Sequence, residues 1–181
     1  MEIEIAPRLL IIAGTGRNTG KTTLACQIIG KFSVIHSIVA VKITPHFHAD
    51  RGNGVVIIDK PNIYIAEELN PATGKDSSLM LKAGAVQSWF VMTTDEYLPE
   101  AFSEILTRIP ANSMVVCESG GLRHLIRPGL FLMMQHPGNG ALKPDSAKLL
   151  SLADRVLNFD GSEFDFDINS IEITDNQWKL K

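Results

Sequence analysis

The segment from residue 9 to residue 32 constrains the fold more than any other part of the chain. An apolar run at residues 9–13 predicts a buried strand, and apolar residues recur at helical spacing over residues 22–32. The stretch GTGRNTGKTT, residues 14–23, joins the two. A β-branched run, SIVAVKI at residues 37–43, predicts a second strand that is covered on both faces. The chain therefore opens with a strand, a glycine-rich loop, a helix and a strand.

The rest of the chain continues this alternation. Further strands are expected at residues 54–58, 62–65, 85–92, 113–117, 130–134 and 155–159, and helices at 76–83, 99–108 and 145–152. Alternating strands and helices predict a doubly wound α/β domain with a mostly parallel sheet. Residues 162–181 are expected to form a peripheral tail or a hairpin at the sheet edge. A length of 181 residues fits one such domain.

Composition narrows the class of protein. Hydrophobic residues make up 45% of the chain and the net charge is −3, without a basic run, so we do not expect nucleic-acid binding. An apolar stretch long enough to span a membrane is also missing from the sequence. Cys26 and Cys117 are expected to be buried thiols, since they form no zinc-ligand spacing. We expect a protein of the reducing cytoplasm.

The glycine-rich loop has the residues of a phosphate-binding P-loop. Gly16 and Gly20 are expected to let backbone amides point inward, and the helix start that follows favours an anion. Lys21 is placed to reach the β- and γ-phosphates, and the Thr22 hydroxyl is placed to bind Mg²⁺. The loop follows a predicted strand and opens a predicted helix, which is the context that this motif requires. The sequence therefore predicts binding of a nucleoside triphosphate.

One position departs from the usual pattern G-x-x-x-x-G-K-[ST]. Thr15 stands where the first glycine is expected, and Gly14 stands one residue earlier. We expect the flanking Gly14 and Gly16 to make the tight turn in its place.

Three further polar residues follow or approach strand ends, where ligands bind in parallel sheets. Glu118 follows an apolar strand and is expected to orient Mg²⁺, or alternatively to cap the glycine turn after it. Lys42 ends a strand and is expected to hold an anion, unless it is a surface lysine. Asp76 could assist Mg²⁺, but capping a helix is the favoured interpretation. Hydrolysis would draw on Lys21, Glu118 and Asp76.

Two other clusters have weaker functional interpretations. His46, His48 and Asp50 carry donors that suit a divalent metal, yet close histidines in a loop are more often surface or substrate contacts. Asn158 and Asp160 are similar to the base-reading residues of GTP-binding proteins, but the lysine between those residues is missing. We expect neither cluster to be central to the function.

Several stretches together resemble the molybdopterin-guanine dinucleotide biosynthesis protein B family. These are RNTGKTTL, VAVKITPHFH, GKDSSLMLKAGA and the ESGG that follows a strand. The resemblance implies a homodimeric GTP-binding protein with slow GTPase activity, accessory to the enzyme that joins GMP to molybdopterin. It implies Mg²⁺-side roles for Thr22 and Glu118. The nucleotide contacts expected from the loop and the resemblance are Gly16, Arg17, Asn18, Thr19, Gly20, Lys21, Thr22, Thr23 and Lys42.

Two alternatives stay open. Gly14-Thr15 before the loop, Lys42 after the second strand and ESGGL at residues 118–122 are also similar to dethiobiotin synthetase and related ATP-dependent carboxylate-amine ligases. That resemblance implies that Lys42 holds a carboxylate or carbamate. The other alternative is a nucleotide-gated switch module without a small-molecule product. The families share a fold, so the fold does not separate these functions.

Overall fold

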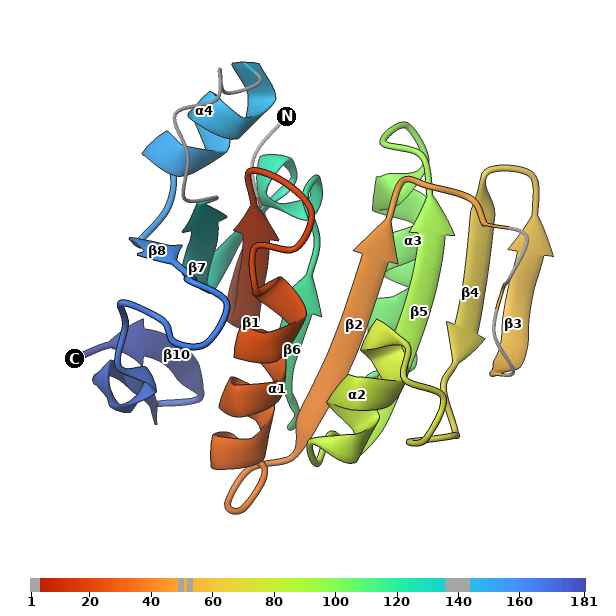
Figure 1. Cartoon of the computed structure of the whole chain (residues 1–181). Coiled ribbons are helices and arrows are strands. Elements are labelled where there is room, and N and C mark those ends of the chain that lie inside the picture. The colour runs from red at the N-terminus through yellow and green to blue at the C-terminus, as the bar shows by residue number, and fades with distance from the viewer. Residues whose placement is uncertain (1–3, 49–50, 52–53, 136–143) are drawn as a thin grey trace.

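A mostly parallel sheet of eight strands forms the centre of the molecule (Figure 1). The computed structural model describes residues 4–48, 51, 54–135 and 144–181. The strand order is β3-β4-β5-β2-β6-β1-β7-β8. The bounds are β1 Glu4–Gly14, β2 Ile38–Thr44, β3 Val55–Lys60, β4 Ile63–Glu67, β5 Gln87–Thr93, β6 Met114–Glu118, β7 Ile126–Gln135 and β8 Arg155–Asn158. The expected α/β class and the mostly parallel sheet are confirmed.

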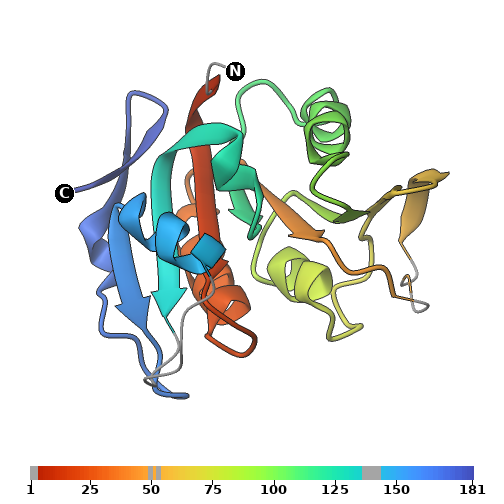
Figure 2. The same ribbon diagram turned by 90° about the horizontal axis from the view of Figure 1, so that it is seen from above.

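Helices cover both faces of the sheet (Figures 1 and 2). Helices α1 (Lys21–Phe32) and α2 (Asp76–Lys82) pack on one face, and α3 (Leu98–Leu106) and α4 (Pro144–Ser151) pack on the other. Successive residues of β1 alternate between the two cores, and each fully buried aliphatic side chain contributes roughly 1.5–3 kcal/mol. Burial on both faces explains the unbroken apolar runs in the sequence. Within the described ranges, every helix is too short or too polar to cross a membrane.

The strands β3 and β4 form an antiparallel hairpin at one end of the sheet. The sequence pattern predicts the two strands at residues 54–58 and 62–65, which leaves residues 59–61 for the turn. In the structure Lys60 still pairs with Ile63, so the loop is Pro61-Asn62. Asn62 has a φ of 67°, the left-handed conformation that short hairpin loops require and that a strand residue does not adopt. The expected start of this strand was therefore one residue early.

Strand β7 begins at Ile126, four residues before the strand that the sequence predicts. Pro128 disfavours a central strand, because proline cannot donate a backbone hydrogen bond. The pairing of β1 with β7 is irregular between Ala6 and Leu10, at the level of Pro128 and of Pro7. This irregularity accommodates both prolines inside the sheet. The connection from β6 to β7 contains only a short 3-10 helix, η1 (Leu122–His124).

The C-terminal residues form a separate two-stranded sheet, β9 (Ile171–Thr174) and β10 (Gln177–Leu180). The hairpin was expected at an edge of the main sheet. That position is wrong, because the hairpin packs instead on the face that α1 covers. Trp178 is fully buried there, lies edge-on to Phe32 at 5.0 Å, and donates from Nε1 to the Arg8 carbonyl. Burial of this indole keeps the hairpin on the face.

Candidate functional site

The loop between β1 and α1, residues 15–20, starts the candidate site. The Thr15 amide donates to the Met134 carbonyl at 2.9 Å, which ties the loop to the end of β7. Gly20 precedes α1 with a φ of 82°, and Asn18 has a φ of 56°. These left-handed residues turn the chain sharply into the helix. No side chain caps the start of α1, so its first amides are available to an anion.

Gly14, at the end of β1, and Gly16, in the loop, differ in the space that is available for a side chain. A Cβ at Gly14 would lie 2.7 Å from Thr19 Oγ1 and 3.2 Å from the Met134 carbonyl oxygen. A Cβ at Gly16 would have no neighbour within 4 Å, and the φ of Gly16 is not in the left-handed region. The loop thus requires glycine at position 14 for space and at position 20 for conformation. Gly16, to which the sequence analysis gave a permissive role, meets neither requirement.

Lys21 is the cation at the mouth of this loop. Its ammonium group donates to the Gly16 carbonyl at 2.6 Å and to Thr19 Oγ1 at 3.1 Å. Burial lowers the pKa of Lys21 below its ordinary value, although Glu118 opposes the shift. Thr19 is itself buried, which fixes the direction of the lysine chain. The loop therefore holds a partly buried ammonium group, which an anionic ligand would stabilise.

Thr22 and Glu118 meet although 96 residues separate them in sequence. Strand β6 lies beside β1, and Ile12 pairs with Glu118, so the end of β6 lies against the first turn of α1. The Thr22 hydroxyl donates to Glu118 Oε2 at 2.8 Å, and Glu118 is almost fully buried. A hydroxyl and a carboxylate are the hard oxygen donors that Mg²⁺ prefers.

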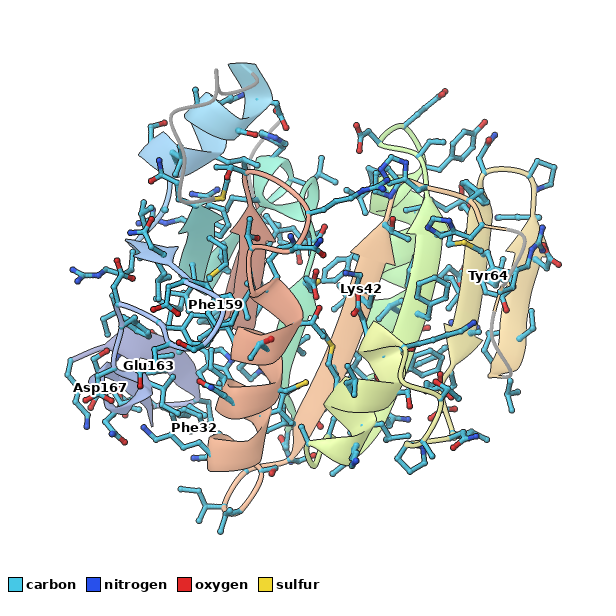
Figure 3. All side chains as sticks on the ribbon, viewed as in Figure 1. Phe32, Lys42, Tyr64, Phe159, Glu163 and Asp167 are labelled. Carbon is cyan, nitrogen blue, oxygen red and sulfur yellow. The ribbon has the colours of Figure 1, made fainter. Side chains whose placement is uncertain are left out.

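Lys42 joins this pair to α2 (labelled in Figure 3). Its ammonium group lies 2.5 Å from Glu118 Oε1 and 2.8 Å from Asp76 Oδ2. Burial alone would lower the pKa of Lys42, but the two carboxylates outweigh it and hold the pKa above its ordinary value. Asp76 is the first residue of α2, and Lys75 occupies the cap position, so the expected capping role of Asp76 is wrong.

The structure therefore brings Lys21, Thr22, Lys42, Asp76 and Glu118 to one edge of the sheet. Of the other loop residues expected to contact a nucleotide, Thr19 and Gly20 line the turn. Exposed residues make up the remainder: Gly16, Arg17, Asn18 and Thr23.

His46 and His48 make no described contact with the side chains of this site. His46 and His48 are exposed, and their ring centroids lie 6.4 Å apart. Asp50 lies outside the described residues. Among the residues described, no group of three histidine, cysteine or acidic side chains could hold a metal ion.

Asn158 and Asp160 are engaged in local structure. The Asn158 amide and side chain both donate to Asp165, and Asp160 accepts from the Ser162 and Glu163 amides. These hydrogen bonds lower the pKa of Asp165 and of Asp160. Neither side chain is free to read a base in this arrangement.

Phe159, the residue between Asn158 and Asp160, packs against the glycine-rich loop of the site. Phe159 lies against Gly20, where a Cβ would come within 2.8 Å of its ring, and it stacks on Phe164 (Figure 3). The loop after β8 therefore supports the glycine turn. The sequence contained no signal for this contact, because it joins residues that are far apart in the chain.

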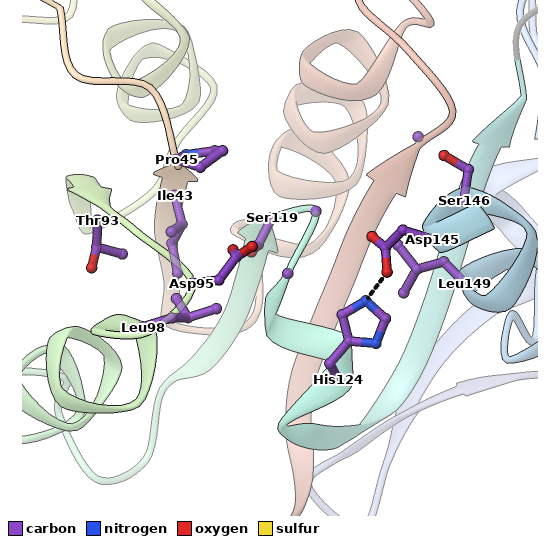
Figure 4. A pocket seen from close by; sticks show the side chains of 13 residues that line it. Ile43, Pro45, Thr93, Asp95, Leu98, Ser119, His124, Asp145, Ser146 and Leu149 are labelled. Atoms are coloured by element: carbon purple, nitrogen blue, oxygen red, sulfur yellow. Dashed lines mark ion pairs between the residues drawn. The ribbon is translucent and has the colours of Figure 1, made fainter. Parts of the chain in front are cut away.

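A pocket on the opposite face of the sheet adjoins the same edge (Figure 4). Asp95, His124 and Asp145 line it, and the sequence analysis gave none of them a role. Each is a single polar residue without a motif, so only the fold brings them together.

Comparisons of the chain with protein-family models, with curated proteins and with solved structures find no match. The function is therefore argued from the residues and their arrangement.

Proposed function

We propose that the chain binds a nucleoside triphosphate, preferably GTP, together with Mg²⁺ in a P-loop at residues 14–23, and hydrolyses it slowly. The observation that carries this proposal is the meeting of Lys21, Thr22 and Glu118 at a glycine-rich loop between a parallel strand and a helix. A lysine, a hydroxyl and a carboxylate in that order are the groups that a triphosphate and its metal ion require.

Phosphate binding would use the amides of residues 16–22 and the ammonium group of Lys21, since the Thr15 amide already donates to the Met134 carbonyl. That group now donates to Gly16 and Thr19, and both bonds can be exchanged for bonds to phosphate oxygens. A charge-assisted hydrogen bond contributes roughly 1.5–3 kcal/mol.

The residues present fit a magnesium ion that is shared with the nucleotide. Mg²⁺ in such sites takes only one or two protein donors and keeps several waters, and Thr22 and Glu118 supply two oxygens 2.8 Å apart. When bound, the ion would neutralise charge on the phosphate oxygens. Lys42 would keep Glu118 and Asp76 in place from the other side.

Hydrolysis needs a group that orients water toward the γ-phosphate. Glu118 and Asp76 are the candidates, and both are held by Lys42. The Lys42 ammonium group occupies one oxygen of each carboxylate, which fits slow turnover. We propose the role that the family resemblance implies, an accessory GTPase in molybdenum cofactor synthesis that acts with a nucleotide-joining enzyme. An ATP-dependent ligase is less favoured, because Lys42 is already bonded to two carboxylates.

The first experiment is titration calorimetry of GTP and ATP with Mg²⁺ under identical conditions. Tighter binding of GTP would support the accessory GTPase, and tighter binding of ATP would support the ligase. If neither nucleotide binds the folded protein, the P-loop proposal is wrong.

Two variants test the residues that carry the proposal. Lys21→Ala should abolish tight binding, whereas the matched Lys179→Ala, a half-buried lysine of the C-terminal hairpin, should not change it. Glu118→Gln should lower the Mg²⁺-dependent turnover more than the affinity, as measured by phosphate release. If Glu118→Gln and the unchanged protein have equal turnover, the Glu118 carboxylate has a structural role and no role in hydrolysis.

A further inference from the structure

The pocket between α3 and α4 results from an irregular connection in the fold. In a doubly wound sheet a helix normally covers the strand connection, but residues 119–125 between β6 and β7 form only the short η1. The space beside η1 is a cavity of about 260 Å³ that opens at the carboxyl edge of the sheet (Figure 4). Cavities for drug-sized ligands start near 300 Å³, so this one suits a small metabolite.

The described lining of this pocket carries two carboxylates and one histidine. Ile43 and Leu149 contribute apolar wall on opposite sides. Asp95 from the loop before α3, His124 from η1 and Asp145 from α4 contribute the ionisable groups. Lysine and arginine are absent from the lining that the structure describes. An anionic ligand would therefore meet two carboxylates and lose its hydration without a matching cation.

Among the described residues, the two carboxylates differ in their partners. His124 Nε2 lies 2.9 Å from Asp145 Oδ1, within ion-pair distance although not aligned as a hydrogen bond. His124 Nδ1 is buried without a hydrogen-bond partner among the described residues. Asp95 makes no hydrogen bond or ion pair within the described ranges, and its Oδ1 lies over Gly121. The pocket thus has an excess of negative charge and unused hydrogen-bonding groups.

The pocket adjoins the glycine-rich loop. Gly14, the last residue of β1 and the start of the glycine-rich stretch, is also part of the pocket lining. Ser119 and Gly120, which follow Glu118, line it as well. A ligand in the pocket would therefore lie next to the triphosphate site, across the end of β1 from α1.

We propose that this pocket binds a small organic cation with a primary ammonium group, as the second ligand of the nucleotide site. The ammonium group pairs with Asp95, and the apolar walls hold a short hydrocarbon chain. The role as second ligand rests on the proposed nucleotide function, whereas amine binding itself does not.

The test uses putrescine as the probe and 1,4-butanediol as its uncharged counterpart, with protein-observed NMR on the whole chain. Putrescine should shift the amide signals of Gly120, Gly121 and His124 with a dissociation constant in the millimolar range, and butanediol should not. Asp95→Asn should weaken putrescine binding about tenfold, the loss expected for one charge-assisted bond. The matched Glu96→Gln, which removes the same charge next to the pocket but outside its lining, should not weaken it.

The proposal is overturned if butanediol or succinate binds as well as putrescine, or if Asp95→Asn and Glu96→Gln lose the same affinity. The spectra also show whether each variant is folded. Measurements without nucleotide, repeated in Lys21→Ala, separate the two proposals. Amine binding that survives in Lys21→Ala supports the pocket even if nucleotide binding fails, and nucleotide binding without amine binding overturns the pocket alone.

Discussion

Replacement of Lys42 by methionine tests how strongly the buried charges of the site depend on one another. The ammonium group lies between Glu118 and Asp76, and the Lys42 and Glu118 side chains are 15% and 3% exposed. Removing one partner of a buried pair costs about 3–5 kcal/mol. Asp76 is 44% exposed and Glu118 keeps its bond from Thr22, so we expect a loss of about 3 kcal/mol, near the lower limit.

The assay is thermal and urea unfolding of Lys42→Met beside the matched Lys60→Met. Lys60 pairs with Glu100 on the surface, where both side chains are about half exposed, and such a pair contributes less than about 1 kcal/mol. A loss of about 3 kcal/mol lowers the Tm of a domain of this size by about 9 °C. Adding Glu118→Gln to Lys42→Met should recover part of the loss, because the buried charge is then gone. Equal losses in the two lysine variants would refute the reasoning.

Two further predictions concern the phosphate loop. Gly14→Ala should weaken triphosphate binding about tenfold, because its Cβ would meet Thr19 Oγ1 at 2.7 Å and overpacking of this kind costs about 1–3 kcal/mol, whereas Gly16→Ala should bind normally in the same calorimetric titration. The affinity for inorganic triphosphate should fall as the pH rises toward the pKa of Lys21, which burial holds below 10.5, because only the ammonium form attracts the anion. An affinity that is constant up to pH 10.5 would contradict this.

The sequence was sufficient to predict those site residues that lie at the carboxyl ends of strands. A strand before the loop and a strand before Glu118 both end at the carboxyl edge, and this argument correctly brought Thr22 and Glu118 near each other. The expectation of an anionic partner for Lys42 followed from the same argument, because a lysine that ends a buried strand needs an anion.

The sequence was insufficient where a contact depends on another element. Aspartate is a residue type that often caps helices, which is why the sequence favoured a cap at Asp76. Only the placement of β2 beside α2 makes Asp76 an ion-pair partner of Lys42. Asp95, His124 and Asp145 share a pocket because a crossover helix is missing, and a missing helix has no motif. The tail alternates like an edge strand, yet burial of Trp178 outweighs that pattern and draws it onto a face.

The attachment of Trp178 to Arg8 spans 170 residues and therefore has a consequence during synthesis on the ribosome. Strand β1 emerges early, but the indole that covers its end emerges only after almost all other described residues. Until then Phe32 lacks the indole that packs on it in the folded chain, and we expect its apolar face to be exposed. The order in which the ribosome delivers the chain thus leaves this face without its cover until the hairpin is made, a period in which a chaperone would have an apolar surface to bind.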